Sequence, residues 1–151
     1  MVKKTKNILY YEAVGRRREA VARVRLYIVG KDNVATVDGI KVKKGEIIVN
    51  KKPIEQIFSS LQDKIQYLNP FKITQTEERF AVSALISGGG KSGQLGALIH
   101  AISRALEKTD KETLRPILKK GKLLTRDSRI RERRKVGTGG KARRVKQSPK
   151  R

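Results

Sequence analysis

Hydrophobic and polar residues alternate most regularly over residues 18–29 (REAVARVRLYIV). A period of two places successive side chains on opposite faces of a strand, so this segment predicts a half-buried strand. Arg23 and Arg25 lie on the face that we expect to be wet, together with Val21 and Tyr27. The expected dry face carries Ala20, Ala22, Val24, Leu26 and Ile28.

Three further segments predict strands. Asp38 and Gly39 stand between apolar residues in 34–42, a pattern typical of a two-residue hairpin turn. Residues 46–50 (EIIVN) predict a short strand. Residues 79–87 (RFAVSALIS) are apolar on both faces, as expected of a central strand.

Helical spacing appears in three places. The first predicted helix begins at Pro53 and ends at Asn69-Pro70, because proline disfavours helix in the residue before it. Its apolar positions are Ile54, Ile57, Phe58, Leu61 and Ile65. An amphipathic helix is predicted over 93–107. A short last helix is expected from Asp110, a suitable N-cap, to Gly121, a suitable C-cap.

Strands and helices without an internal repeat predict an α+β fold. We expect a flexible N-terminus over 1–6, a compact domain over 7–118 and an extended basic tail over 119–151. The tail has 15 Lys and Arg residues against two acids, Asp127 and Glu132. Its last 27 residues hold only three large aliphatic side chains, too few to form a core of their own.

The charge of the whole chain narrows the classes of partner. The 151 residues include 37 Lys and Arg against 14 Asp and Glu, a net charge of +23, which favours a polyanionic partner. The absence of cysteine and a single histidine exclude a disulfide framework, a thiol nucleophile and the usual zinc sites. The longest apolar stretch, about seven residues at 80–86, is too short to span a bilayer, so we expect a soluble intracellular protein.

The glycine-rich segment 87–93 (SGGGKSG) admits several interpretations. A P-loop requires glycine five residues before Gly90, where this chain has Leu85. A dinucleotide-binding turn requires an acid at the end of a following parallel strand, and none is predicted. Two interpretations are favoured over a nucleotide site: a tight turn from strand to helix, and an anion site where the helix N-terminus and Lys91 meet an RNA phosphate.

Candidate catalytic groups are scarce. His100, the only imidazole, falls away from the apolar face of its helix, so we expect it to face solvent or RNA. The acids of the domain are not arranged as a catalytic pair, so we expect no enzyme activity and no cofactor or small-molecule substrate. A nucleotide-dependent enzyme using 88–93 and a free-standing nucleic-acid compactor are retained as alternatives.

Clusters of cations are the strongest indication of function in this sequence. Because they contain few acids, phosphate binding is favoured over a solvated surface of mixed charge. Aromatic residues make up 5% of the chain and are not spaced as a base-stacking platform, so recognition of RNA shape and backbone is expected. The candidate RNA-binding residues are Arg16, Arg17, Arg18, Arg23, Arg25, Lys91, Arg104, Arg126, Arg129, Arg133, Arg134, Lys135, Lys141, Arg143 and Arg144.

Taken in order, these segments resemble the bacterial-type small-subunit ribosomal protein number nine family. The resemblance runs collinearly over about residues 9–151. It rests on 15–24 (GRRREAVARV), 49–58 (VNKKPIEQIF), 88–97 (GGGKSGQLGA) with His100, 114–116 (LRP), 121–127 (GKLLTRD) and 141–144 (KARR).

This resemblance implies a structural RNA-binding protein of the small-subunit head, in contact with ribosomal RNA and neighbouring head proteins. The implied fold is a two-layer sandwich, a mixed sheet with helices on one face and a left-handed crossover. It also implies that Lys150 and Arg151 approach the transfer RNA of the peptidyl site. No membrane is involved, and the expected location is the cytoplasmic ribosome, with an organellar ribosome left open. Residues Val34 to Gly45 look like an insertion relative to the family, and Pro149 is a departure near the tail end.

Overall fold

The computed structural model describes residues 3–5, 8–29, 34–37, 39–138 and 140. The described strands are β1 (Lys3–Thr5), β2 (Ile8–Arg17), β3 (Ala20–Ile28), β4 (Val34–Val37), β5 (Ile40–Lys43), β6 (Ile47–Val49), β7 (Lys52–Pro53) and β8 (Phe80–Ser87). The described helices are α1 (Ile54–Ile57), α2 (Leu61–Thr74), α3 (Lys91–Thr109) and α4 (Lys111–Lys120).

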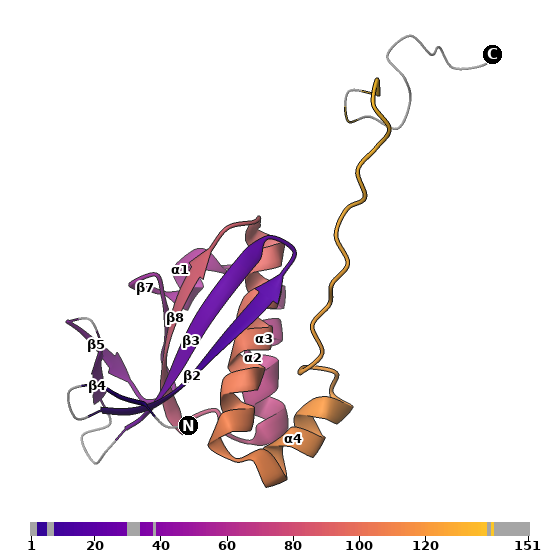
Figure 1. Ribbon diagram of the computed structural model, residues 1–151. Helices are drawn as coiled ribbons and strands as arrows, with labels where there is room; N and C mark the ends of the chain where they lie inside the picture. Colours follow the sequence, from indigo (N-terminus) through magenta and orange to yellow (C-terminus); the bar gives the residue numbers. More distant parts are fainter. Residues whose placement is uncertain (1–2, 6–7, 30–33, 38, 139, 141–151) are drawn as a thin grey trace.

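The predicted α+β class is confirmed, with a mixed sheet. Six strands follow the order β1-β2-β3-β8-β6-β7, while β4 and β5 form a separate two-stranded hairpin. The β6–β8 pair is parallel and the other described pairs are antiparallel. β8 lies inside the sheet, as its apolar pattern predicts. Helices α2 and α3 cover one face of the sheet, and α4 packs at their lower end (Figure 1).

The main core lies between α3 and the sheet. Leu98, Ile102 and Leu106 of α3 are fully buried, as are Val24 and Leu26 of β3. A close approach of β2 to α3 accompanies this packing. A β-carbon added at Gly15 would lie 2.2 Å from the Ala97 carbonyl oxygen, so only glycine fits there.

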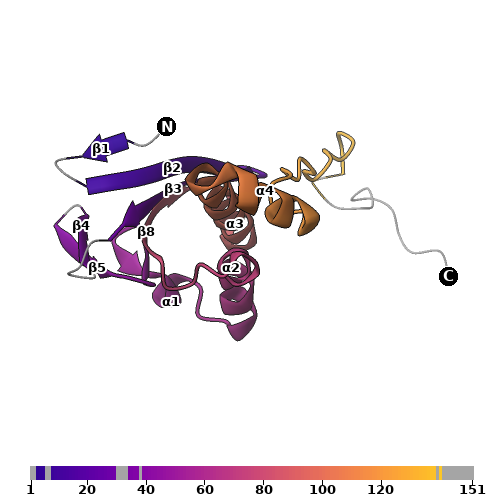
Figure 2. The ribbon, with the colours of Figure 1, turned by 90° about the horizontal axis from the view of Figure 1, so that it is seen from below.

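The β4–β5 hairpin covers part of the opposite face of the sheet (Figure 2). Val37 and Val42 of the hairpin pack there with Tyr10 and Tyr27, whose ring centroids lie 5.6 Å apart. The expected two-layer sandwich therefore gains a partial third layer. Tyr27, expected on the wet face, is buried beneath the hairpin, whereas Ile28 is exposed because the main core along β3 ends at Leu26.

The prediction of one helix over 53–69 is wrong. The chain leaves the helix at Phe58, which is buried in the core, and a second helix begins after Ser60. Leu61 and Ile65, expected on the buried face, are exposed.

Pro70 does not end the helix either but lies inside α2. Proline has no N–H to donate to the preceding turn, which ordinarily disfavours a helix interior. Here Pro70 and Phe71 are both buried, and the Thr74 hydroxyl donates to the Pro70 carbonyl over 2.8 Å. Burial of this turn compensates for the missing bond.

The two ends of α4 agree with the sequence more closely than the N-terminus does. The Asp110 side chain accepts a hydrogen bond from the Thr113 N–H, so it caps α4 as predicted. Gly121 is the C-cap, although Lys122 rather than the glycine adopts the left-handed conformation. At the other terminus, part of the segment expected to be flexible forms β1 and pairs with β2.

Candidate nucleic-acid interface

A column of side chains on α3 lines the edge of β2. His100, Arg104 and Lys108 are four residues apart and therefore share one face of the helix. The Arg104 guanidinium donates to the Val14 carbonyl, and the Lys108 ammonium donates to the Glu12 carbonyl. These bonds cover backbone groups at the sheet edge, where an unpaired strand would otherwise be exposed. Arg104 therefore has a structural contact in addition to its exposed charge.

His100 belongs to this column and is half-buried with both ring nitrogens hydrogen-bonded, whereas the sequence predicts that it faces solvent or RNA. The Arg16 N–H donates to its Nδ1 over 3.4 Å, so the proton lies on Nε2, which donates to the Leu124 carbonyl over 3.3 Å. Burial lowers the pKa of His100, and the charges of Arg104 and Arg126 act in the same direction. A neutral imidazole thus bridges β2 and the segment after α4.

The glycine-rich segment forms a tight turn between β8 and α3. Gly88 and Gly89 have positive φ angles, and a β-carbon at Gly88 would lie 2.6 Å from the Glu19 carbonyl oxygen. Gly90 is the N-cap of α3. No strand follows α3 within the described part of the chain, so the parallel strand required by a dinucleotide-binding fold is missing there.

Cations from three segments line one cavity of about 730 Å³ at this turn. Arg18 comes from the β2–β3 turn, Lys91 from the first turn of α3, and Arg126 and Arg131 from the segment after α4. Glu19 and Ile130 also line the cavity. All four cations are exposed, and the Lys91 ammonium lies 3.8 Å from a carboxylate oxygen of Asp63, a loose ion pair. We call this cavity the basic cleft.

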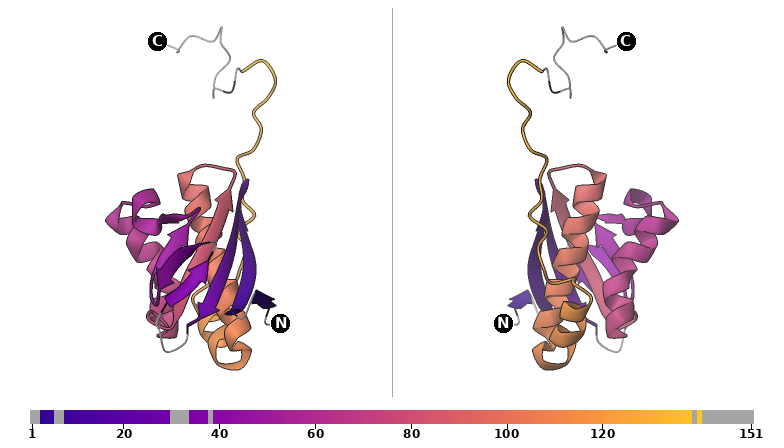
Figure 3. Two further views of the ribbon diagram at one scale, coloured as in Figure 1. Left: turned by 90° about the vertical axis from the view of Figure 1, so that its left-hand side faces the viewer. Right: turned by 90° about the vertical axis from the view of Figure 1, so that its right-hand side faces the viewer.

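The segment after α4 reaches the basic cleft by running back along α3 (Figure 3). It passes His100 at Leu124, then meets Arg17 at Asp127, and lines the cleft with Arg126 and Arg131. Leu123 and Leu124 still pack against the main core. Residues 129–135 are exposed and belong to no helix or strand.

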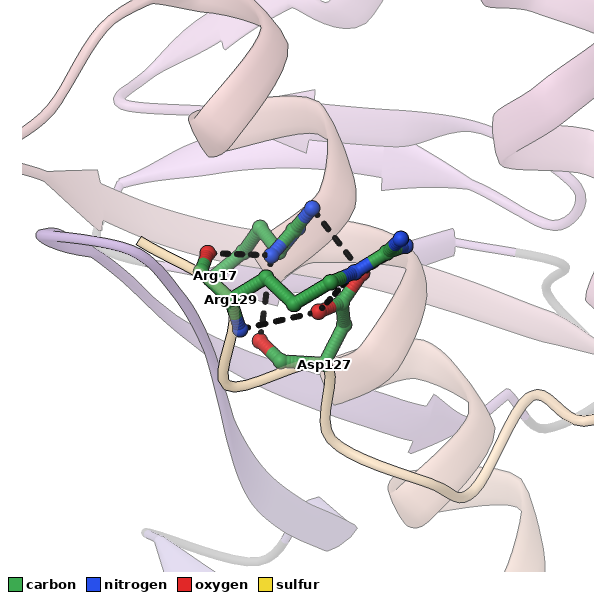
Figure 4. A network of polar contacts seen from close by, with 3 residues as sticks. All are labelled: Arg17, Asp127 and Arg129. Atoms are coloured by element: carbon green, nitrogen blue, oxygen red, sulfur yellow. Dashed lines mark hydrogen bonds and ion pairs between the residues drawn. The ribbon is translucent and has the colours of Figure 1, made fainter. Parts of the chain in front are cut away.

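Arg17, Asp127 and Arg129 form a polar cluster where this segment crosses the end of the β2–β3 hairpin (Figure 4). The Arg17 guanidinium donates to the carbonyls of Asp127 and Arg129 and pairs with the Asp127 carboxylate over 2.9 Å. The Arg129 guanidinium closes on the same carboxylate through Nε and Nη2. Hydrogen bonds from Arg129, together with the charges of Arg129 and Arg17, hold the pKa of Asp127 well below its usual range.

The remaining candidate cations divide into free and engaged groups. Arg16 and Arg23 are exposed at neighbouring positions on adjacent strands of the sheet. Arg25 is engaged, since its guanidinium bonds the Glu12 carboxylate over 2.9 Å and lies over the Tyr10 ring. Glu12 and Arg25 are direct cross-strand partners, which favours such a pair.

The rest of the candidate set lies farther along the chain. Arg133, Arg134 and Lys135 are exposed beyond the cleft. The candidates outside the described residues are Lys141, Arg143, Arg144, Lys150 and Arg151.

The described residues hold neither a metal site nor a membrane-spanning helix. No group of three or more His, Cys, Asp or Glu side chains there could hold a metal ion. No described helix combines the length and apolar character needed to cross a membrane.

Comparisons with known proteins identify the family of the chain. The family model described as Ribosomal protein S9/S16 matches residues 15–151. The chain is 43% identical over 148 residues to the small ribosomal subunit protein uS9 of Rickettsia rickettsii (strain Sheila Smith), covering 98% of this chain and 83% of that protein. It is 44% identical over 128 residues to the protein of the same name from Dehalococcoides mccartyi (strain CBDB1), covering 85% of this chain and 86% of that protein.

Proposed function

Since the chain belongs to the ribosomal protein S9/S16 family, we propose that it binds small-subunit ribosomal RNA through phosphate contacts and reaches peptidyl-site transfer RNA with its C-terminal end. The family consists of structural ribosomal proteins and not of enzymes. The protein accordingly acts in the cytoplasm, within the small ribosomal subunit and beside other subunit proteins.

The observation that carries the proposal is the basic cleft. Four cations from three chain segments face one cavity, with a single acid, Glu19, among them. Such a concentration of like charge is unfavourable in isolation and becomes favourable when a polyanion enters. Each phosphate that meets a Lys or Arg releases condensed counterions, which supplies affinity without base recognition. The N-terminus of α3 opens at the same cavity and adds N–H donors.

The segment 119–151 acts in this proposal as a basic tail. Lys119 and Lys120 end α4, and Leu123 and Leu124 pack against the main core. Residues 130–151, with ten Lys and Arg and few apolar residues, are therefore the part that we propose follows an RNA backbone into spaces that a folded domain cannot enter. Arg16 and Arg23 on the open part of the sheet extend the contact area. Family membership also implies that the connection between the parallel strands β6 and β8 is a left-handed crossover, and we propose this handedness for the present fold.

The substitution Lys91→Glu tests the basic cleft. It reverses one charge at the first position of α3, where a carboxylate is compatible with the helix dipole. We expect several-fold weaker binding to isolated small-subunit RNA and a salt slope lower by about one. The measurement is a titration of RNA with protein at several salt concentrations.

Lys111→Glu is the matched control, since Lys111 is exposed, begins α4 and does not line the cleft. It changes the net charge equally, so we expect a smaller loss. Equal losses in both variants would mean that the cleft has no special role. Micromolar, magnesium-dependent ATP binding by the unmodified protein would instead support a nucleotide site.

Deletion of Lys150 and Arg151 tests the transfer RNA contact. Charge-assisted hydrogen bonds contribute roughly 1.5–3 kcal/mol at best and less where water screens them. We expect peptidyl-site transfer RNA to bind small subunits more weakly, by roughly 1–3 kcal/mol in total, with assembly intact. The measurement is filter binding of transfer RNA at matched protein occupancy.

A control removes two charges from the opposite end of the chain through Lys3→Gln and Lys4→Gln. We expect this variant to hold transfer RNA as the unmodified protein does. Transfer RNA affinity that is unchanged by the C-terminal deletion would show that the last two residues do not reach it.

A further inference from the structure

Asp127 lies near the start of the basic tail, where a negative charge is unfavourable for phosphate binding. Its presence there therefore needs an explanation other than RNA contact. The tail has only one other acid, Glu132. A carboxylate repels phosphate, so a role in RNA contact does not explain Asp127. Its bonds lie within the protein, to Arg17 of β2 and to Arg129 two residues along.

Arg17 is held in place from two sides. Its backbone pairs with Ala20 at the last register position before the β2–β3 turn. Its aliphatic stem lies against α3, where a β-carbon at Gly96 would be 3.0 Å from the Arg17 Cγ. The side chain is only 22% exposed, and its guanidinium points to the tail (Figure 4). Arg17 is therefore part of the rigid domain.

The tail is tied to this fixed group through both side chain and backbone. Arg17 bonds the carbonyls of Asp127 and Arg129 over 3.2 and 3.0 Å, while the Asp127 carboxylate receives Arg17 and Arg129 together. His100 adds a tie at the Leu124 carbonyl. Because the low pKa of Asp127 keeps its carboxylate ionised, the cluster persists at neutral and mildly acidic pH.

Without these ties, electrostatics would drive the tail away from the hairpin. Arg16, Arg17 and Arg18 carry three adjacent positive charges, and Arg126, Arg129 and Arg131 approach them. Like charges at this separation repel, and the Asp127 carboxylate offsets this repulsion because it pairs with both Arg17 and Arg129.

We propose that Arg17 and Asp127 are positioning residues that fix the direction in which the tail leaves the domain. The fixed exit aligns Arg126 and Arg131 with Arg18 and Lys91 at the basic cleft and directs the described residues 132–138 away from the domain. This proposal rests on the proposed RNA-binding function. It adds that the tail is aimed before RNA arrives, which lowers the ordering cost of binding.

The first test measures the direction of the free tail. The chain has no cysteine, so Gln62→Cys on α2 and Val136→Cys in the tail provide two unique sites for spin labels, both exposed. We expect a narrow distance distribution by pulsed electron paramagnetic resonance. Asp127→Asn and Arg17→Gln should broaden it at least twofold, with the thermal midpoint of the domain little changed.

Glu132→Gln is the matched control for charge. It removes one negative charge five residues farther along, from a side chain that makes no hydrogen bond or ion pair with any residue the structure describes. The two amide variants have the same net charge. If net charge alone determined the association rate, both variants would associate with RNA faster than the unmodified protein. If Asp127 positions the tail, Asp127→Asn should associate about fivefold more slowly than Glu132→Gln.

The outcomes separate this proposal from the RNA-binding function. Equal association rates for Asp127→Asn and Glu132→Gln, or an unchanged distance distribution in Asp127→Asn, would overturn the positioning role. Failure of the unmodified protein to bind small-subunit RNA would instead contradict the proposed function, and the distance measurement would still report whether the cluster fixes the exit of the tail.

Discussion

Removal of residues 130–151 is expected to weaken binding to small-subunit RNA by about 100-fold or more at 0.1 M salt. The deletion takes away ten of the 37 Lys and Arg residues but leaves the main core, Leu124 and the Arg17–Asp127–Arg129 cluster in place. The slope of log K against log salt should flatten by about 0.7–0.9 for each phosphate contact that is lost. RNA titrations at several salt concentrations measure both quantities.

A full-length variant with glutamine at those ten positions separates the effect of charge from that of chain length. It should bind as weakly as the truncated protein, because counterion release depends on charge. Thermal unfolding of both variants should match the unmodified protein, since the described residues 130–137 are exposed. A salt slope that survives the truncation would contradict the proposed role of the tail.

The substitution Gly15→Ala is expected to destabilise the domain by about 3 kcal/mol or more. The added methyl group would lie 2.2 Å from the Ala97 carbonyl oxygen and 2.4 Å from the Ala101 nitrogen. These are backbone atoms in the middle of α3, so neither can move aside without shifting the helix. Chemical denaturation measures the loss, and a large fall in the soluble fraction on expression is expected as well.

Gly121→Ala is the control for this substitution. Its φ angle is −74°, and a β-carbon there would meet its nearest neighbour at an ordinary 3.5 Å. We expect a change of less than about 1 kcal/mol, because neither strain nor a clash results. If Gly15→Ala unfolded at the same denaturant concentration as Gly121→Ala, the close packing of β2 on α3 would be refuted.

Gly15 also shows why one long strand could not be predicted from hydropathy. β2 presents Ala13 and Gly15 to α3, because the helix lies too close for larger side chains. A core face made of small residues gives no alternation of large apolar and polar positions. β3 was predicted because Val24 and Leu26 supply that alternation.

The break in the first predicted helix has a different cause. The spacing of Ile54, Phe58 and Ile65 is compatible with one helix, and Pro70 is an ordinary stop signal. In the fold, Phe58 occupies the core at the end of a short helix, and Pro70 is buried together with Phe71. Tertiary packing decides both points, and local spacing contains no information about it.

The candidate interface was predictable in its chemistry but not in its internal contacts. Cation clusters in the sequence indicate phosphate binding without reference to the fold. Which cations are free depends on partners far away in the chain: Arg17 meets Asp127 at a separation of 110 residues, and His100 meets Arg16 at a separation of 84. No local pattern signals such pairs.

Sedimentation of the native protein tests the central claim most directly. A lysate of cells that carry the tagged full-length chain is separated on a sucrose gradient at moderate salt, with and without deoxyribonuclease. We predict that the protein migrates with small ribosomal subunits at about one copy per subunit, and that deoxyribonuclease does not move it. A protein that stays at the top of the gradient, or follows DNA, would contradict its assignment to the small subunit.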